Sequence, residues 1–294
     1  MFAGIGAGTL SVLFICGSYI FSREYVRKHK DPIKLSVMSQ LVMGIGGVIL
    51  LWVSSRFYTI EWTGKLCWLL AGQVITFLMG QTAFFAMLRR VESSRAAALL
   101  GLKILAIAII ATMIGKTLSP MQWLAVFLCT VAAVGMTFSG GKIALSSCLW
   151  LFMAVFSYAL CDMCVTELML LMPGKSMLIN SFGVIGICYT ALGLAVSPAL
   201  FKYRMNRKEF IDVLPYSALY FLSMIFLYTS FGLIGVVFGS IIQSGRGILS
   251  VLLGIVLVHY GLDRNERRVS PLKWVQRFVC ATVMLAAMVI YSLS

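Results

Sequence analysis

Long apolar runs recur along the whole 294-residue chain and restrict it to a membrane fold. A helix rises 1.5 Å per residue, so about 20 apolar residues cross roughly 30 Å of hydrocarbon. Charged residues make up only 12% of the chain, too few to cover a soluble domain. We predict an all-α integral membrane protein with ten transmembrane helices, over residues 3–21, 33–53, 67–88, 96–114, 121–138, 148–172, 177–200, 213–234, 236–260 and 272–293.

Tryptophan positions support these span boundaries. The amphipathic indole ring favours the membrane–water interface. All six tryptophans lie near predicted span ends: Trp52, Trp62, Trp68, Trp123, Trp150 and Trp274. The eighth and ninth spans are separated only by Gly232 and Gly235, in an apolar stretch too long for a single crossing.

The distribution of cations predicts the orientation. The chain has 24 Lys and Arg against 10 Asp and Glu; 17 of these cations lie in odd-numbered loops, 4 in even-numbered loops and 3 inside spans. Cytoplasmic loops carry the excess of Lys and Arg, so we expect a multi-pass plasma (inner) membrane protein with odd loops cytoplasmic and both termini extracytoplasmic. The first apolar run has no basic segment before it, and we expect it to stay uncleaved. The basic loop "FKYRMNRKEFIDV" favours a membrane surface over nucleic acid.

Motifs for other functions are absent from the sequence. There is no H-E-x-x-H, no G-x-S-x-G and no Gly-rich phosphate loop, and His29 and His259 stand alone. The eight cysteines fall in or beside apolar runs, which predicts buried free thiols, and the C-x-x-C of Cys161 and Cys164 lies inside an apolar helix. We therefore expect no enzyme, no metal and no cofactor.

The two halves of the chain resemble each other weakly. The parallels are Ser18-Tyr19 with Ser157-Tyr158, Lys103 with Arg246 in a late helix of each half, and Ser119-Pro120 with Ser270-Pro271. Five helices per half insert with opposite orientations, an arrangement typical of secondary transporters. The predicted organisation is two inverted five-helix repeats, residues 1–140 and 141–294.

The stretch "ESSRAAALLGLKILAIAIIATMIGKTLSPMQWLAVFLCTVAAVGMTF" resembles the ten-helix EamA type of the drug/metabolite transporter superfamily. The resemblance covers essentially the whole chain and implies a membrane transporter. Two departures stand out: Lys103 replaces a proline found in the fourth helix of many bacterial members, and Gly115-Lys116 replaces the usual glutamate. Cations in the fourth and ninth helices are similar to those of the sugar-phosphate and nucleotide-sugar branches, where such residues hold the substrate's phosphate.

Lys103 and Arg246 are the candidate substrate-binding cations. Each lies deep inside a predicted span, where a charge is costly unless it faces a watery cavity or a partner. Gly239, Gln243, Arg246 and Ser250 follow one another at spacings of four, three and four residues, so that helix presents a polar stripe on one face. Guanidinium and ammonium groups suit carboxylate or phosphate, so the predicted ligand has at least one negative group and is anionic or zwitterionic.

Asp162 is the only acid well inside a span, one turn after Tyr158. It has two interpretations: a counter-ion for Lys103 or Arg246, or a protonation site that couples transport to a gradient. Tyr158, Gln81 and Tyr19 would add neutral hydrogen bonds to the substrate.

We therefore expect a secondary transporter, an exporter or exchanger, that moves a small metabolite with a carboxylate or phosphate by alternating access around a central cavity. One alternative is a proton-coupled exporter of amino acids or cationic drugs. Another is a membrane scaffold or lipid-handling subunit without transport. The expected partners are a small-molecule substrate, the bilayer and a coupling proton, with no nucleic acid, in a monomer or homodimer.

Overall fold

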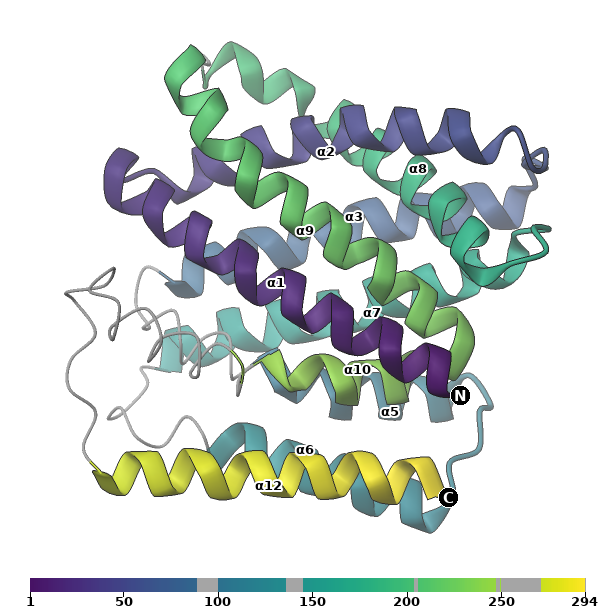
Figure 1. Cartoon of the computed structure of the whole chain (residues 1–294), viewed down its shortest axis with the longest axis vertical. Coiled ribbons are helices and arrows are strands. Elements are labelled where there is room, and N and C mark those ends of the chain that lie inside the picture. Colours follow the sequence, from purple (N-terminus) through teal and green to yellow (C-terminus); the bar gives the residue numbers. More distant parts are fainter. Residues whose placement is uncertain (89–99, 136–144, 204–205, 247–248, 250–270, 294) are drawn as a thin grey trace. The chain divides into compact units, whose positions relative to one another are not determined.

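A computed structural model describes the chain except for residues 89–99, 136–144, 204–205, 247–248, 250–270 and 294 (Figure 1). All regular structure in the described residues is helical. The α-helices are α1 (Phe2–His29), α2 (Pro32–Ser54), α3 (Gly64–Leu88), α5 (Lys103–Met113), α6 (Pro120–Gly135), α7 (Leu145–Leu171), α8 (Met177–Val196), α9 (Arg207–Ile234), α10 (Val236–Ser244) and α12 (Pro271–Leu293). There are also two short 3-10 helices: η1 (Leu100–Leu102) precedes α5, and η3 (Ser197–Phe201) follows α8.

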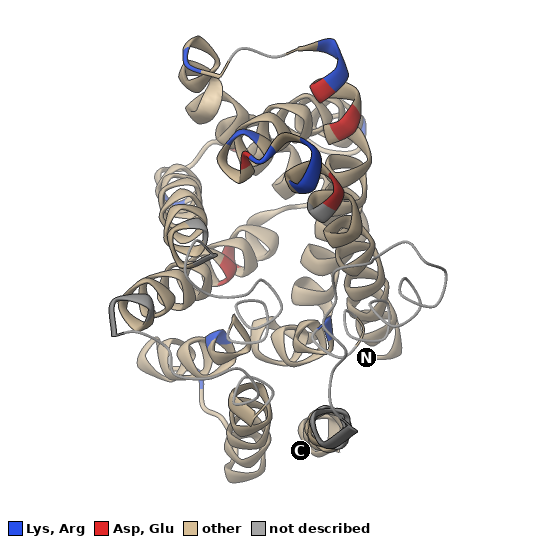
Figure 2. Cartoon of the chain, turned by 90° about the vertical axis from the view of Figure 1, so that its left-hand side faces the viewer, with Lys and Arg blue, Asp and Glu red and all other residues tan. Residues whose placement is uncertain are grey.

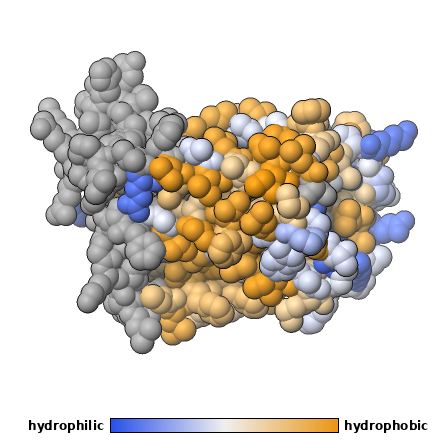
Figure 3. Space-filling model, turned by 90° about the horizontal axis from the view of Figure 1, so that it is seen from below, coloured by the Kyte–Doolittle hydropathy of each residue, from blue (hydrophilic) through white to orange (hydrophobic). Residues whose placement is uncertain are grey.

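Six of these helices contain segments long and apolar enough to cross a membrane: α1, α2, α3, α7, α8 and α9. They coincide with the predicted first, second, third, sixth, seventh and eighth spans. The fourth, fifth and tenth predicted spans contain α5, α6 and α12, and the ninth begins as α10 and continues outside the described residues. Hydrophobic side chains cover much of the described surface in Figure 3. Many large apolar residues of the described chain are exposed, and the Trp68 side chain of α3 is 82% exposed. An exposed apolar surface of this kind requires lipid around it.

Two spanning helices are longer than predicted because their polar ends stay helical. α1 continues past residue 21 to His29 and ends at Lys30, which has a left-handed φ of 57°. α9 begins at Arg207, six residues before the predicted span, where the Glu209 carboxylate accepts a hydrogen bond from the backbone N–H of Asn206 at 3.2 Å. That bond satisfies a donor just before the first turn, which allows the helix to start in the loop.

The predicted break between the eighth and ninth spans is confirmed at Gly235. This residue separates α9 from α10 and has a φ of 79°, a conformation that favours glycine. Gly232, the other predicted breaker, stays within α9 and packs against Met169 and Met177. A single glycine therefore ends the helix.

The helices form two compact units, and each unit takes segments from both halves of the sequence. Unit 1 consists of residues 1–76 and 161–236, and unit 2 of residues 77–160 and 237–294. α3 and α7 each contribute one end to unit 1 and the other to unit 2. Within unit 1 the two helices run antiparallel: the Lys65 ammonium lies 3.9 Å from the Glu167 carboxylate, and Gln73 Nε2 lies 3.9 Å from Cys161 Sγ.

In unit 1, α1 packs along α9 through a seam of small polar residues, the serine seam. The Ser11 and Ser223 hydroxyls lie 3.1 Å apart, and Ser223 Oγ donates to the carbonyl of Ser11 at 3.0 Å. Farther along, Ser230 Oγ donates to the carbonyl of Gly4 at 2.9 Å. Small side chains let two helices approach closely, and their hydroxyls supply hydrogen bonds that lipid cannot.

α2 packs against α8 through a second seam, made of glycines. A Cβ on Gly44 would lie 3.0 Å from the Cα of Gly193, and one on Gly47 would lie 2.9 Å from the backbone N of Thr190. From the other helix, a Cβ on Gly186 would lie 2.9 Å from the backbone N of Leu51. Since backbone atoms occupy these positions, only glycine allows this separation between the helices.

Unit 2 packs α6 against α12 and α5. Gln276 Nε2 donates to the carbonyl of Gly135 at 2.6 Å, which ties α12 to the end of α6. Phe238 of α10 stacks on Tyr291 of α12, with ring centroids 5.2 Å apart. The second of these contacts connects α12 to α10, the helix that carries Gln243.

Candidate functional site

The predicted site residues divide between the two units. Lys103, Gln243, Arg246, Tyr158 and Gln81 belong to unit 2, whereas Asp162 and Tyr19 belong to unit 1. Within unit 2 the structure brings these residues into two hydrogen-bonded pairs, Lys103 with Gln243 and Tyr158 with Gln81.

Lys103 and Gln243 form the first pair. Lys103 is only 7% exposed and Gln243 only 3%. The Lys103 ammonium donates to Gln243 Oε1 at 2.5 Å, although 140 residues separate them in the chain. A hydrogen bond from a charged donor is stronger than a neutral one, so this contact fixes the ammonium on α10.

Both candidate cations lie where a helix is interrupted. Lys103 is the first residue of α5 and follows the 3-10 turn η1, so it begins the α-helix instead of lying inside it. α10 ends at Ser244, and Gly245 forms a turn before Arg246, which is 7% exposed. Ser250, the last member of the predicted polar stripe, lies outside the described residues. Interrupted helices with exposed backbone ends are typical of transporter binding sites.

The second pair orients an aromatic hydroxyl. Tyr158 Oη donates to Gln81 Oε1 at 2.8 Å. The Tyr158 ring lies against Gly80, where a Cβ would be 3.0 Å away, and edge-on to Phe77 at 6.3 Å between centroids. The sequence predicts both polar residues as separate ligands; in the structure they also bind each other.

Asp162 lies in the middle of α7 and is 9% exposed. Thr166 Oγ1 donates to the backbone carbonyl of Asp162 at 2.9 Å, so that hydroxyl binds its own helix. Five residues after Asp162, the Glu167 carboxylate lies 3.9 Å from the exposed Lys65 ammonium. Tyr19 lies half-buried on α1.

All eight cysteines are free, but they are not all buried as predicted. Cys67 and Cys148 are exposed because they lie on outward faces in the first turns of α3 and α7. Cys129 and Ser244 lie 3.4 Å apart in unit 2. Among the residues that the structure describes, no group of three or more His, Cys, Asp or Glu is placed to hold a metal ion.

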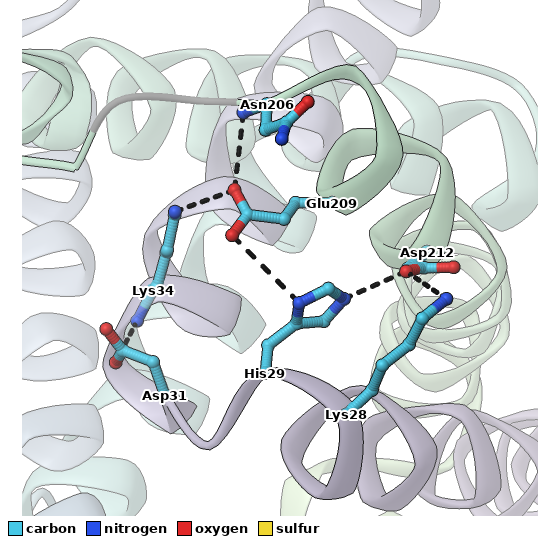
Figure 4. A network of polar contacts seen from close by, with 7 residues as sticks. All are labelled: Lys28, His29, Asp31, Lys34, Asn206, Glu209 and Asp212. Carbon is cyan, nitrogen blue, oxygen red and sulfur yellow. Dashed lines mark hydrogen bonds and ion pairs between the residues drawn. The ribbon is translucent and has the colours of Figure 1, made fainter.

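A charged network that was not predicted from the sequence lies at one end of unit 1 (Figure 4). His29 does not stand alone: its Nε2 lies 2.8 Å from an Asp212 oxygen that also binds the Lys28 ammonium at 2.7 Å. The Lys34 ammonium lies 2.6 Å from Glu209, and the Lys34 backbone N–H donates to Asp31. The spacing of Glu209 and Asp212 was a usable signal, because residues three apart share one helical face.

The network joins loop 1, between α1 and α2, to the start of α9. The predicted eighth span begins at residue 213, so both carboxylates lie outside it. The hydrogen bond from Lys34 lowers the pKa of Glu209, and that from Lys28, followed by that from His29, lowers the pKa of Asp212. Figure 2 shows charged residues of both signs gathered at this end of the helices.

Acid is expected to weaken this end of unit 1. Both carboxyls have a lower pKa in the folded protein than in the unfolded chain, where it is about 4. Their contribution to the free energy of unfolding is therefore complete at a pH above the unfolded-state pKa, and it is lost as the pH falls through the folded-state pKa. The melting midpoint should hold between pH 7 and 5 and decline below. Asp212→Asn should lower it by a few degrees at pH 7 and flatten the acid decline.

The matched control is Glu61→Gln, which removes an exposed acid from loop 2. It should leave both the midpoint and its pH dependence unchanged. Scanning calorimetry of the purified protein measures each curve. An Asp212→Asn protein with the wild-type acid profile would show that the network does not stabilise the fold.

Comparisons with known proteins give a family match for the first half of the chain. Residues 2–138 match the model of the EamA-like transporter family. No curated protein matches the chain. A solved structure described only as "Crystal structure of protein" aligns with a TM-score of 0.67 at 12% identity, covering 99% of this chain and 96% of its own. At that identity the likeness shows the fold alone.

The helices and their apolar surface define a multi-pass α-helical membrane protein. The family match confirms the resemblance drawn from the sequence over the first half of the chain: residues 2–138 are similar to EamA-like transporters, which belong to the drug/metabolite transporter superfamily. This match supports a membrane transporter of that type.

Proposed function

We propose that the protein is a secondary active transporter, an exporter or exchanger, of a small metabolite that carries a carboxylate or phosphate. The observation that carries the proposal is the buried Lys103–Gln243 pair, with Arg246 three residues farther along, at two helix interruptions of unit 2. Two cations in a buried setting favour an anionic ligand, because each is costly there unless negative charge is close.

The composition of unit 2 supports an anionic substrate. Its described residues include no Asp and no Glu. Negative charge near Lys103 and Arg246 therefore comes from a ligand or from outside these residues. The positive end of the α5 dipole, where Lys103 begins the helix, adds to the attraction for an anion.

Neutral groups would orient the substrate. Gln243 holds the Lys103 ammonium in place, and the Tyr158 hydroxyl is fixed by Gln81. We assign Tyr19 a further hydrogen bond to the substrate. In this role each group selects for shape and polar pattern, while the two cations supply affinity.

Alternating access by two inverted repeats is part of the proposal. In such a repeat, α1 corresponds to α7, α2 to α8, α3 to α9 and α6 to α12. The contact between α1 and α9 then corresponds to the contact between α7 and α3, and the α2–α8 and α6–α12 contacts each join a helix to its own counterpart. These observed helix pairs are consistent with the exchange. We propose an inner-membrane location with odd loops cytoplasmic; the network in Figure 4 joins loops 1 and 7, which the charge count assigns to one face.

Asp162 favours a second candidate, a proton-coupled exporter of amino acids or cationic drugs. Its carboxyl is buried midway along α7, a position expensive for a charge unless it is paired or protonated. In the first candidate Asp162 is a counter-ion for the cations; in the second it carries the coupling proton and the cations are structural.

Reconstitution into liposomes with an imposed proton gradient tests these roles. Uptake of a panel of carboxylates and phosphates should be lost in Arg246→Ala and retained in part by Asp162→Asn. The reverse pattern, retained uptake in Arg246→Ala and loss in Asp162→Asn, supports the second candidate. Absence of flux for every compound in well-folded protein would reject transport of such anions and favour a scaffold or lipid-handling role.

A further inference from the structure

Five exposed cations lie around the charged network at one end of unit 1. They come from the last turn of α1 and the residue after it, from the residue after η3, and from the first turn of α9: Arg27, Lys30, Lys202, Arg207 and Lys208. We call this set the basic rim. The Lys28–Asp212 and Lys34–Glu209 ion pairs hold the helix ends that carry the rim side by side (Figure 4).

Most of the acidic residues in this region already take part in the network. Residues 24–34 and 201–212 contain eight Lys and Arg and four acids. Three of the acids, Asp31, Glu209 and Asp212, already bind Lys28, His29 or Lys34. The rim thus keeps an excess of positive charge that faces outward.

Apolar side chains accompany the rim. Phe201 is 92% exposed, Ile211 54% and Leu214 37%. Below them, Tyr203 and Tyr216 pack against the buried cluster of Tyr25, Leu35, Met38 and Val213. The Lys202 ammonium lies over the Tyr203 ring, 5.6 Å from its centroid. Exposed apolar groups beside cations are characteristic of a membrane–water interface, where the first enter lipid and the second meet headgroups.

We propose that the basic rim binds anionic phospholipid headgroups in the leaflet that this end of unit 1 faces. Guanidinium and ammonium groups donate to phosphate oxygens, and Phe201, Ile211 and Leu214 contact the adjoining acyl chains. The exposed apolar groups select a lipid over a soluble anion or a hydrophilic protein. The basic rim includes neither Lys103 nor Arg246, the residues of the proposed transport site.

Native mass spectrometry of the purified full-length protein in neutral detergent tests the proposal. Phosphatidylglycerol should bind more tightly than phosphatidylcholine of matched chain length. Replacing Lys202, Arg207 and Lys208 together by Gln should weaken phosphatidylglycerol binding by roughly tenfold or more, since each cation near the surface contributes about fivefold. Phosphatidylcholine binding should not change.

A matched control removes three exposed cations elsewhere in unit 1, Arg56, Lys65 and Lys175. This Gln triple variant should keep its phosphatidylglycerol affinity. Equal binding of both lipids, or an unchanged affinity in the rim variant, overturns the proposal. Displacement of the lipid by glycerol 3-phosphate at similar concentration also overturns it, because a small-anion site would then suffice. Arg246→Ala should lose uptake and keep lipid binding, which separates this test from that of the transport function.

Discussion

Gln243→Glu is expected to abolish uptake of anionic substrates while the protein stays folded. The side-chain oxygen that accepts the Lys103 hydrogen bond at 2.5 Å remains in the same place, but it now carries charge. The resulting ion pair neutralises the Lys103 ammonium without changing side-chain size. We expect uptake in liposomes to fall by roughly 100-fold, because a hydrogen bond to a charged group contributes about 3 kcal/mol at most.

Stability separates this outcome from misfolding. The new carboxylate and the Lys103 ammonium would form a buried pair of well-matched geometry, so the melting midpoint should stay equal to that of the wild type or rise. Gln122→Glu is the matched control in the same unit: Gln122 Oε1 accepts from the backbone N–H of Ser119 at 3.0 Å, and a glutamate there keeps that bond. Full uptake in the Gln243→Glu protein, or equal losses in both variants, contradicts the assigned role of Lys103.

The double variant Gly44→Ala, Gly47→Ala should be strongly destabilised. The added methyl groups would lie 3.0 Å from the Gly193 Cα and 2.9 Å from the Thr190 backbone N, and neither backbone atom can rotate away. α2 and α8 must separate along their whole seam to accommodate them. Overpacking of this kind costs about 3 kcal/mol or more, which lowers the melting midpoint by roughly 10 °C.

Gly6→Ala with Gly64→Ala provides the control, because a Cβ at either position meets nothing within 4 Å. The same chemical change should there leave the midpoint unchanged or raise it slightly, since alanine has the higher helix propensity. Thermal unfolding followed by circular dichroism gives both values. Similar midpoints for the two double variants would show that the seam tolerates a wider spacing.

Hydrophobic length predicted the spanning helices because each apolar run must satisfy its backbone within the bilayer. Helix ends were less predictable: α1 and α9 extend into the loops through polar contacts such as the Glu209–Asn206 bond, which has no hydropathy signal. The break at Gly235 was predictable because glycines are the only helix-breaking residues between the eighth and ninth predicted spans.

The candidate site was predicted as residue types but not as geometry. Lys103 and Arg246 were identifiable because placing a cation inside an apolar span costs free energy, so such a residue is seldom found there without a function. The Lys103–Gln243 bond joins residues 140 positions apart, and no local pattern indicates which helices pack together. The partner of His29 was unpredictable for the same reason, because Asp212 lies 183 positions away.

The serine seam between α1 and α9 fixes an order of events in biogenesis. Ser11 meets Ser223 across 212 positions of sequence, so α1 enters the membrane long before α9 exists. At about 5–20 residues per second of synthesis, the first helix waits roughly 10–40 s for its partner. Some hydroxyls of α1 find a partner within their own helix during that interval, as Ser18 does by donating to the Ile15 carbonyl. Ser11, in contrast, meets Ser223 only when α9 has been inserted. A factor that shields nascent helices from lipid would thus act on α1 first and for longest.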